Sequence, residues 1–99
     1  MTAAVPYQRS SERFSHKAPI ILEDFRTGFV YKGIMYNFSA NGMYFESDYA
    51  PRPDRKLRIT ANELPGQPSP QVYLAKVKWR RPLSKIPSPY SFGIGVKYC

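Results

Sequence analysis

The stretch Gly28-Phe-Val-Tyr-Lys-Gly-Ile-Met-Tyr-Asn-Phe-Ser-Ala-Asn-Gly-Met-Tyr-Phe-Glu-Ser47 decides the fold of this chain. Both of its halves contain aromatic residues, and the first also contains β-branched ones; both residue types favour strands. Between the halves stands Asn41-Gly42, a dipeptide that is favoured in tight hairpin turns. The stretch therefore predicts two antiparallel strands, over Gly28–Tyr36 and Gly42–Ser47.

The rest of the 99 residues is divided by ten prolines and six glycines into short segments of the same kind. No segment keeps an uninterrupted apolar period of 3.6 residues over three turns, so the pattern indicates an all-β domain. Four further strands are expected over Ala18–Asp24, Lys56–Thr60, Val72–Arg80 and Ser91–Tyr98. Six strands suit a small closed antiparallel β-barrel.

Alternation along the strands predicts which side chains face the core. Leu57 and Ile59 alternate with polar neighbours, which indicates one buried face. In the fifth strand Trp79 falls in phase with Val77, and this phase favours packing in the core over contact with a planar ligand. In the sixth strand Gly93 and Gly95 fall on the outer face, where they leave a bare surface for a ligand, the arm or a bulge.

The first seventeen residues show no strand pattern and few residues that could anchor them to a core. We therefore expect a mobile N-terminal arm over 1–17 and a barrel over 18–99. An arm of this kind can become ordered on a ligand, which would make binding a conformational switch.

Length and composition bound the classes of function. The chain is long enough for one domain, has no apolar run of membrane-spanning length and lacks the apolar stretch of a secretory signal, so a cytosolic protein without membrane insertion is expected. The lone Cys99 and lone His16 do not make a metal site, and no catalytic triad or facing carboxylate pair is visible. We expect neither a metal, nor a cofactor, nor catalysis.

The formal net charge is +8, and Glu63 is the last acidic residue. A basic field of this kind attracts polyanions, including nucleic acid, an acidic membrane surface or a phosphate-rich small ligand, but it does not choose among them. A solvated basic face that only maintains solubility is the simpler alternative.

Two short motifs carry the functional argument. The first is Arg9-Ser-Ser-Glu-Arg13 in the arm, and the second is Asn37-Phe-Ser39-Ala-Asn41-Gly42 at the hairpin. Each arginine presents a planar, permanently charged fork that can hold phosphate oxygens or the acceptor edge of a purine. The amide and hydroxyl of the second motif suit a base edge, although the same residues could simply cap the turn.

In this order the motifs resemble those of the PilZ domain family, whose pattern is RxxxR in an N-terminal arm followed by D/NxSxxG at the start of a strand pair. The resemblance covers nearly the whole chain, including the closing segment Phe92-Gly-Ile-Gly-Val96. It implies a β-barrel that binds cyclic di-GMP, acts on a downstream protein partner and regulates motility, exopolysaccharide synthesis or another bacterial surface behaviour. No DNA or RNA partner is implied.

The residues that match the family pattern become the candidate ligand contacts. They are Arg9, Arg13, Asn37, Ser39 and Gly42, with Gln8, Asn41 and Trp79 as further candidates.

Two of these positions depart from commoner forms of the family. Asn37 stands where an aspartate is commoner, and a neutral acceptor is expected to bind guanine more weakly by about 1 kcal/mol. Gln8 stands where members that hold a stacked pair of ligand molecules have an arginine, which favours one ligand per protomer. Trp79 resembles in position an aromatic residue that stacks on guanine in some members.

Two other functions stay open at this point. A small basic barrel could bind single-stranded nucleic acid through surface aromatic residues and a cationic strand. A family member could also act as a protein adaptor without a ligand, as divergent members that lack the arginines do.

Overall fold

The computed structural model describes residues 13–62, 70–84 and 88–99, with side chains from residue 17 onwards. These residues form six strands, and the part of the chain that is described contains no helix. The strands are β1 (Arg13–Asp24), β2 (Val30–Ser39), β3 (Gly42–Ser47), β4 (Lys56–Ala61), β5 (Gln71–Pro82) and β6 (Phe92–Tyr98). The predicted all-β fold is confirmed.

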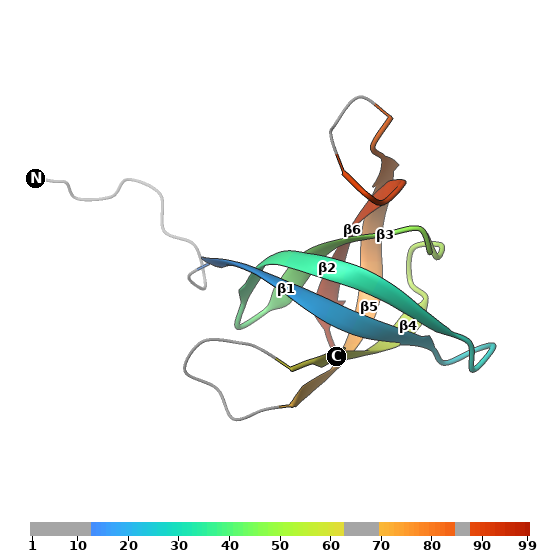
Figure 1. Ribbon diagram of the computed structural model, residues 1–99. Helices are drawn as coiled ribbons and strands as arrows, with labels where there is room; N and C mark the ends of the chain where they lie inside the picture. Colours follow the sequence, from blue (N-terminus) through green and yellow to red (C-terminus); the bar gives the residue numbers. More distant parts are fainter. Residues whose placement is uncertain (1–12, 63–69, 85–87) are drawn as a thin grey trace, which may run out of the picture.

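The strands close into a barrel in the order β1-β2-β3-β6-β5-β4, and every neighbouring pair is antiparallel (Figure 1). Closure depends on β1, which pairs with β2 along one side and with β4 along the other. A closed barrel leaves no unpaired strand edge. Ligands and partners of this domain therefore meet its outer surface, its ends or its connections.

The inner face of the sheet forms one hydrophobic core. Phe45, Leu57, Ile59 and Ile94 are completely buried there, as the alternation of β4 and β6 predicts. The other buried members of the core are Ala18, Ile20, Leu22, Met35, Phe38, Met43, Ala61, Ala75, Val77 and Val96.

The expected boundary between arm and barrel requires a correction. The expected barrel began at Ala18, whereas β1 begins at Arg13, so 13–17 belong to the strand and not to an arm. The register of the β1–β2 pair shifts between Ser15 and Ala18, and this irregularity hides the alternation that marks a regular strand. Residues 1–12, which hold Gln8, Arg9 and the rest of the expected arm, lie outside the described residues.

A buried carboxylate holds one end of the barrel together. Asp24, at the end of β1, accepts hydrogen bonds from the Tyr49 hydroxyl, from Arg55 Nη1 at 2.7 Å and from the Arg26 backbone N–H at 2.7 Å. Tyr49 in turn stacks on Tyr31, with ring centroids 3.9 Å apart. The β1–β2 turn and the β3–β4 connection are thus tied to each other through one side chain.

Burial raises the pKa of Asp24, but the hydrogen bonds from Tyr49, from the Arg26 backbone and from Arg55 lower that pKa by more, and the net shift is downward. A carboxyl group with a lowered pKa in the folded state stabilises the fold above its ordinary pKa of 3.8, and this contribution is lost as the pH falls through the lowered value.

We expect Asp24→Asn to lower the free energy of unfolding at neutral pH by about 2 to 3 kcal/mol, because it removes the charge to which four donors are directed. The difference from the wild type should shrink as the pH falls below 3.8. Urea unfolding over a pH series measures both quantities. Glu23→Gln is the matched control, since Glu23 makes an exposed ion pair with Arg58 at 3.1 Å and should cost less than about 0.5 kcal/mol. Equal losses in both variants would contradict a special role for Asp24.

Candidate ligand-binding face

Strand register places the second sequence motif in a row of residues that crosses four strands on the outside of the barrel. Asn37 of β2 pairs with Tyr44 of β3, Tyr44 pairs with Gly95 of β6, and Gly95 pairs with Trp79 of β5. Directly opposed residues of antiparallel strands share one face of the sheet. We call the outer surface of β2, β3, β6 and β5 that carries this row the motif face.

The structure overturns the predicted core position of Trp79. Its side chain lies on the motif face and is 43% exposed. The register of the β5–β6 pair shifts between Val77 and Trp79, so one extra residue enters β5 there. A single inserted residue moves the following side chains to the other face, and a phase counted from Val77 therefore fails at Trp79.

The two outer glycines of β6 make room for aromatic rings. A Cβ atom on Gly95 would overlap the indole of Trp79, and a Cβ atom on Gly93 would lie 2.5 Å from the hydroxyl oxygen of Tyr44. The two rings stack on each other, with centroids 5.7 Å apart and planes inclined by 24°. The bare surface expected at these glycines is thus covered by a pair of flat rings, which form the floor of the motif face.

Cationic side chains border this aromatic floor. The guanidinium carbon of Arg81 lies 5.8 Å from the ring centroid of Tyr44 and 5.6 Å from that of Trp79. On the opposite side, Lys17 Nζ lies 5.7 Å from the ring centroid of Tyr36, which is itself tilted against Tyr44. Flat rings flanked by Lys and Arg can stack on a planar base and attract its phosphate groups.

Glu46 occupies an outward position of β3, yet its exposed fraction is only 7%. Its carboxylate accepts hydrogen bonds from the Tyr44 hydroxyl at 2.8 Å and from the Ser88 hydroxyl at 2.6 Å. Ser88 lies shortly before β6, so this hydrogen bond holds the segment directly before β6 to the motif face. The hydrogen bond also sets the direction of the Tyr44 ring.

Burial raises the pKa of Tyr44, and the hydrogen bond to Glu46 raises it further, while Arg81 acts in the opposite direction. Burial also raises the pKa of Tyr36, again with a contribution from the Glu46 charge. Both phenols therefore stay neutral donors over the physiological pH range, because ionisation would place a second negative charge beside Glu46.

The turn of the second motif is built by its own residues. The Ser39 hydroxyl accepts hydrogen bonds from the backbone N–H groups of Asn41 at 3.2 Å and Gly42 at 3.3 Å, so Ser39 does cap the turn. A Cβ atom on Gly42 would overlap the carbonyl oxygen of Val96, so this glycine is required by the close contact of β3 with β6. Gly42 does not adopt a positive φ; among the described glycines only Gly28 does.

The register brings the end of the first motif to the second. Arg13 pairs with Ser39, and Ser15 pairs with Asn37, so the C-terminal arginine of the first motif lies beside the turn of the second. The side chain of Arg13 is outside the described part of the structure, as are Gln8 and Arg9 altogether. Asn41 is an exposed turn residue next to Gly42.

Sequence reasoning did not identify Tyr36, Tyr44, Glu46 or Arg81 as residues of this face. The alternation of β3 contained a usable signal, since Tyr44 falls out of phase with the buried Met43 and Phe45. No comparable signal exists for Arg81, because its position depends on the register shift in β5.

The described residues contain no group of three or more histidine, cysteine or acidic side chains that could hold a metal ion. They also contain no helix that is long and apolar enough to cross a membrane.

Fold and outer face together define a small antiparallel barrel domain that offers a basic, aromatic surface. Comparison with known proteins gives the family: the model of the PilZ domain matches residues 7–98. The chain therefore belongs to the PilZ domain family, a family of binding and receptor domains.

A solved structure agrees with this assignment at the level of the fold. The PilZ domain of CeSA from a cellulose-synthesizing bacterium superposes with a TM-score of 0.60 at 15% sequence identity. The match covers 88% of this chain and 80% of that chain. No curated protein matches the chain in sequence.

We expect Gly95→Ala to displace the indole of Trp79, because the added methyl group occupies the space of the ring. Trp79 is the only tryptophan of the chain, so its fluorescence reports this movement directly: emission should shift to the red, and quenching by acrylamide should increase. Overpacking should also cost about 1 to 2 kcal/mol of stability.

Gly93→Ala is the companion variant, since its methyl group meets the hydroxyl end of Tyr44 and not the indole. It should change the tryptophan emission less than Gly95→Ala does. Unchanged emission in a folded Gly95→Ala protein would show that the indole does not lie on Gly95.

Proposed function

We propose that this domain is a cyclic di-GMP receptor that binds the ligand on the motif face. The observation that carries the proposal is the register of β1, β2 and β3, in which Arg13 lies beside Ser39 and Ser15 lies beside Asn37. Arg13, the last residue of the first motif, thus lies beside the second motif, although more than twenty residues separate the two in the sequence. Family membership supports the same ligand.

Each part of the face has a role in this proposal. Arg9 and Arg13 bind phosphate oxygens or the O6 and N7 acceptors of guanine. Asn37 offers its amide to the other edge of the base. Ser39 and Gly42 act indirectly, because the Ser39 hydroxyl holds the turn and Gly42 allows β3 to approach β6.

The aromatic floor adds a stacking contribution. Trp79 is exposed on the face, and its ring lies on Gly95 beside Tyr44. A planar guanine can stack on such a ring, at about 1 to 3 kcal/mol per base. Because Glu46 holds the Tyr44 hydroxyl and the two rings are packed together, the floor is fixed before a ligand arrives, which reduces the entropic cost of binding.

The charge distribution favours a dianionic ligand at this place. Lys17 and Arg81 border the floor, and the one carboxylate of the face, Glu46, is buried under hydrogen bonds from two hydroxyl groups. The exposed part of the motif face is therefore cationic among the described residues.

Ligand binding would order the arm that carries Arg9 and so change the surface offered to a downstream protein partner in the cytoplasm. Regulation of motility or exopolysaccharide production is the output that fits the family. The proposal requires neither a metal nor a further cofactor.

Calorimetric titration with cyclic di-GMP tests the proposal. We expect saturable binding by the wild type, none with GMP, and a loss of at least about tenfold in affinity for Arg13→Ala, equivalent to about 1.4 kcal/mol. Arg58→Ala is the matched control, because Arg58 lies on β4, away from the motif face, and should bind as the wild type does.

The same titration separates the two alternatives. A nucleic-acid-binding barrel would bind a short oligonucleotide with a steep dependence on salt and would ignore cyclic di-GMP. A ligand-independent adaptor would give no heat with either compound while remaining folded. Either result would contradict the proposal that the domain is a cyclic di-GMP receptor.

Asn37→Asp provides a second test of the same site. An ionised acceptor forms hydrogen bonds about twice as strong as a neutral one, so the variant should bind cyclic di-GMP about fivefold more tightly, a gain of about 1 kcal/mol. Weaker binding would contradict the assignment of Asn37 as an acceptor for guanine. Asn62→Asp makes the same substitution directly after β4, away from the motif face, and controls for the change in net charge.

A further inference from the structure

The β1–β2 turn, at the end of the barrel away from the turn of the second motif, presents large hydrophobic side chains to solvent. Phe25 is 45% exposed, Phe29 64% and Val30 61%. We call these three residues the hydrophobic tip. The turn projects from the barrel at the right of Figure 1 and is convex. Single exposed apolar residues are ordinary, but three in six consecutive positions at a projecting turn form a patch, which marks an interaction surface.

The turn that carries this tip is held in one conformation. The buried carboxylate of Asp24 accepts a hydrogen bond from the Arg26 backbone N–H, and the Asp24 carbonyl oxygen accepts one from the Gly28 N–H at 2.7 Å. Gly28 has a φ of 77°, a backbone conformation that residues with a side chain rarely adopt. The Phe29 N–H donates a hydrogen bond to the Thr27 hydroxyl at 3.1 Å. The exposure of both phenylalanines is therefore a property of a fixed turn and not of a loosely packed loop.

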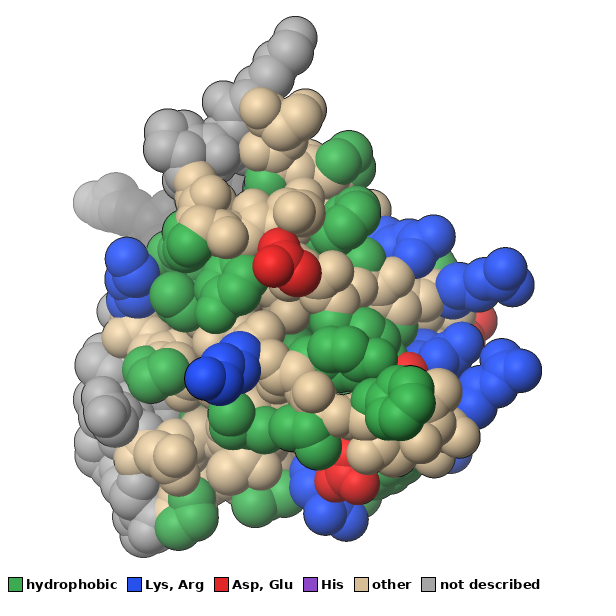
Figure 2. Space-filling view, turned by 45° about the vertical axis from the view of Figure 1, so that its right-hand side comes forward, with side chains coloured by type: hydrophobic (Ala, Val, Ile, Leu, Met, Phe, Trp, Pro, Cys, Tyr) green, Lys and Arg blue, Asp and Glu red, His purple; other side chains and the backbone are tan. Residues whose placement is uncertain are grey.

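Basic side chains surround the tip. The guanidinium carbon of Arg58 lies 5.7 Å from the ring centroid of Phe25, and Lys56 accepts a backbone hydrogen bond from Phe25. Arg26 lies in the turn itself, and Lys32 follows Val30 on the same face of β2. Green hydrophobic groups stand among blue Lys and Arg groups on the side towards this turn in Figure 2.

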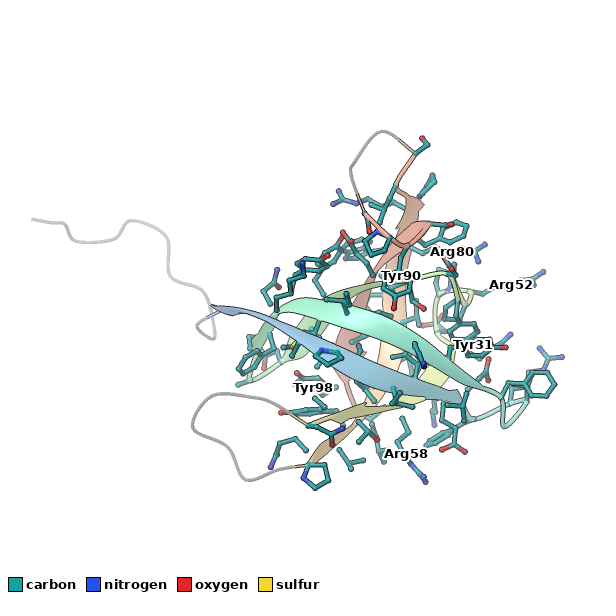
Figure 3. The ribbon with its side chains drawn as sticks, viewed as in Figure 1. Tyr31, Arg52, Arg58, Arg80, Tyr90 and Tyr98 are labelled. Atoms are coloured by element: carbon teal, nitrogen blue, oxygen red, sulfur yellow. The ribbon has the colours of Figure 1, made fainter. Side chains whose placement is uncertain are left out.

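Acidic side chains compensate this charge only in part. Glu23 forms an ion pair with Arg58, and Asp24 is buried in its pair with Arg55. Arg26, Lys32 and Lys56 form no ion pair within the described residues. Figure 3 shows Arg52 above this turn and Arg58 below it, both extending outwards. The exposed acidic residues of the β3–β4 connection are Asp48 and Asp54.

We propose that the hydrophobic tip binds the surface of an anionic lipid bilayer. Phenyl rings on a convex turn suit the boundary between headgroups and acyl chains, and the surrounding cations suit anionic headgroups. A helical protein segment would require a groove to receive its apolar face, whereas this surface projects. The tip lies at the Val30 end of β2, whereas the motif row crosses β2 at Asn37, near its other end, so this inference does not rest on the proposed ligand.

The proposal changes one expectation from the sequence. Hydropathy predicts no membrane insertion, and none of the described segments is a spanning helix. The tip instead would place two side chains at the interfacial depth of a bilayer while the barrel stays in water. A hydropathy window of about 19 residues cannot detect such a site, because the tip offers only three large apolar residues among polar neighbours.

Co-sedimentation with vesicles tests the proposal. We expect the full chain to sediment with vesicles of phosphatidylcholine containing about one third phosphatidylglycerol, and not with phosphatidylcholine alone. The double variant Phe25→Ser and Phe29→Ser should lose at least about tenfold in apparent affinity. Raising the salt concentration should weaken wild-type binding, because it screens the basic residues around the tip.

The chain offers a matched control. Val72 and Leu74 on β5 are exposed to 55% and 48%, comparable with the phenylalanines, but lie outside the hydrophobic tip. The double variant Val72→Ser and Leu74→Ser should bind vesicles as the wild type does. Thermal unfolding of both double variants shows that each is folded.

A second readout follows insertion directly. In a Trp79→Phe background, Phe29→Trp places the single tryptophan at the tip, and its emission should shift to the blue on addition of the anionic vesicles. The proposal is wrong if the wild type does not bind these vesicles at low salt, if the serine variant of the tip binds as tightly as the wild type, or if the tryptophan at position 29 stays in water. The first result would assign the tip to a protein partner, and the second would assign vesicle binding to charge alone.

Discussion

Closure of the sheet through β1 is the constraint on which the rest of this structure depends. β1 pairs with β2 along nearly its whole length and with β4 through Ile20–Asp24, so every other ladder is held in register by this closure. One face of each strand then fills a core of fixed size. The outer face contributes much less to the core and is free to carry chemistry. Asp24, the last residue of β1, joins the two connections that meet at one end of the closed barrel.

Closure of the barrel also explains why the strands that form the motif face contain shifts in register. Register shifts occur between Ser15 and Ala18 in β1, between Met35 and Asn37 in β2, and between Val77 and Trp79 in β5. Shifts of this kind are common where strands of a small barrel bend. Two of them flank the row from Asn37 to Trp79. The distortions that let the barrel close therefore also turn Trp79 outwards, and the glycines of β6 provide the space in which the rings lie flat.

The described structure thus has two surfaces of different character. The motif face is a floor of stacked aromatic rings with a cationic border, built on four strands, in which the buried Glu46 accepts the hydrogen bond of Tyr44. The hydrophobic tip is a short turn fixed by the buried Asp24. In both cases a carboxylate that is shielded from water organises the residues around it, and exposed cations outnumber exposed acids nearby. Both surfaces therefore carry part of the positive charge that gives the chain its formal net charge of +8.

The sequence by itself determined the fold class, the number of strands and most of their positions. The predicted range of β3 is confirmed, and those of β4 and β6 differ from the structure by one residue, because alternation of apolar and polar residues reports directly on a strand with one buried face. The family pattern from Asn37 to Gly42 was equally local, since it covers only the end of β2, the turn that follows and the first residue of β3. The side-chain chemistry of Arg9 and Arg13 stays a prediction.

Only the tertiary structure decided what lies around that pattern. Trp79 was assigned to the wrong face because a strand phase carries no information about an inserted residue, whose position depends on the partner strand. Gly42 serves the approach of β3 to β6, a contact between residues more than fifty positions apart. Tyr44, Glu46 and Arg81 join the face through pairings that local sequence does not encode. Periodicity records which face of a strand is buried, whereas a site on a barrel is assembled from the register of all its strands.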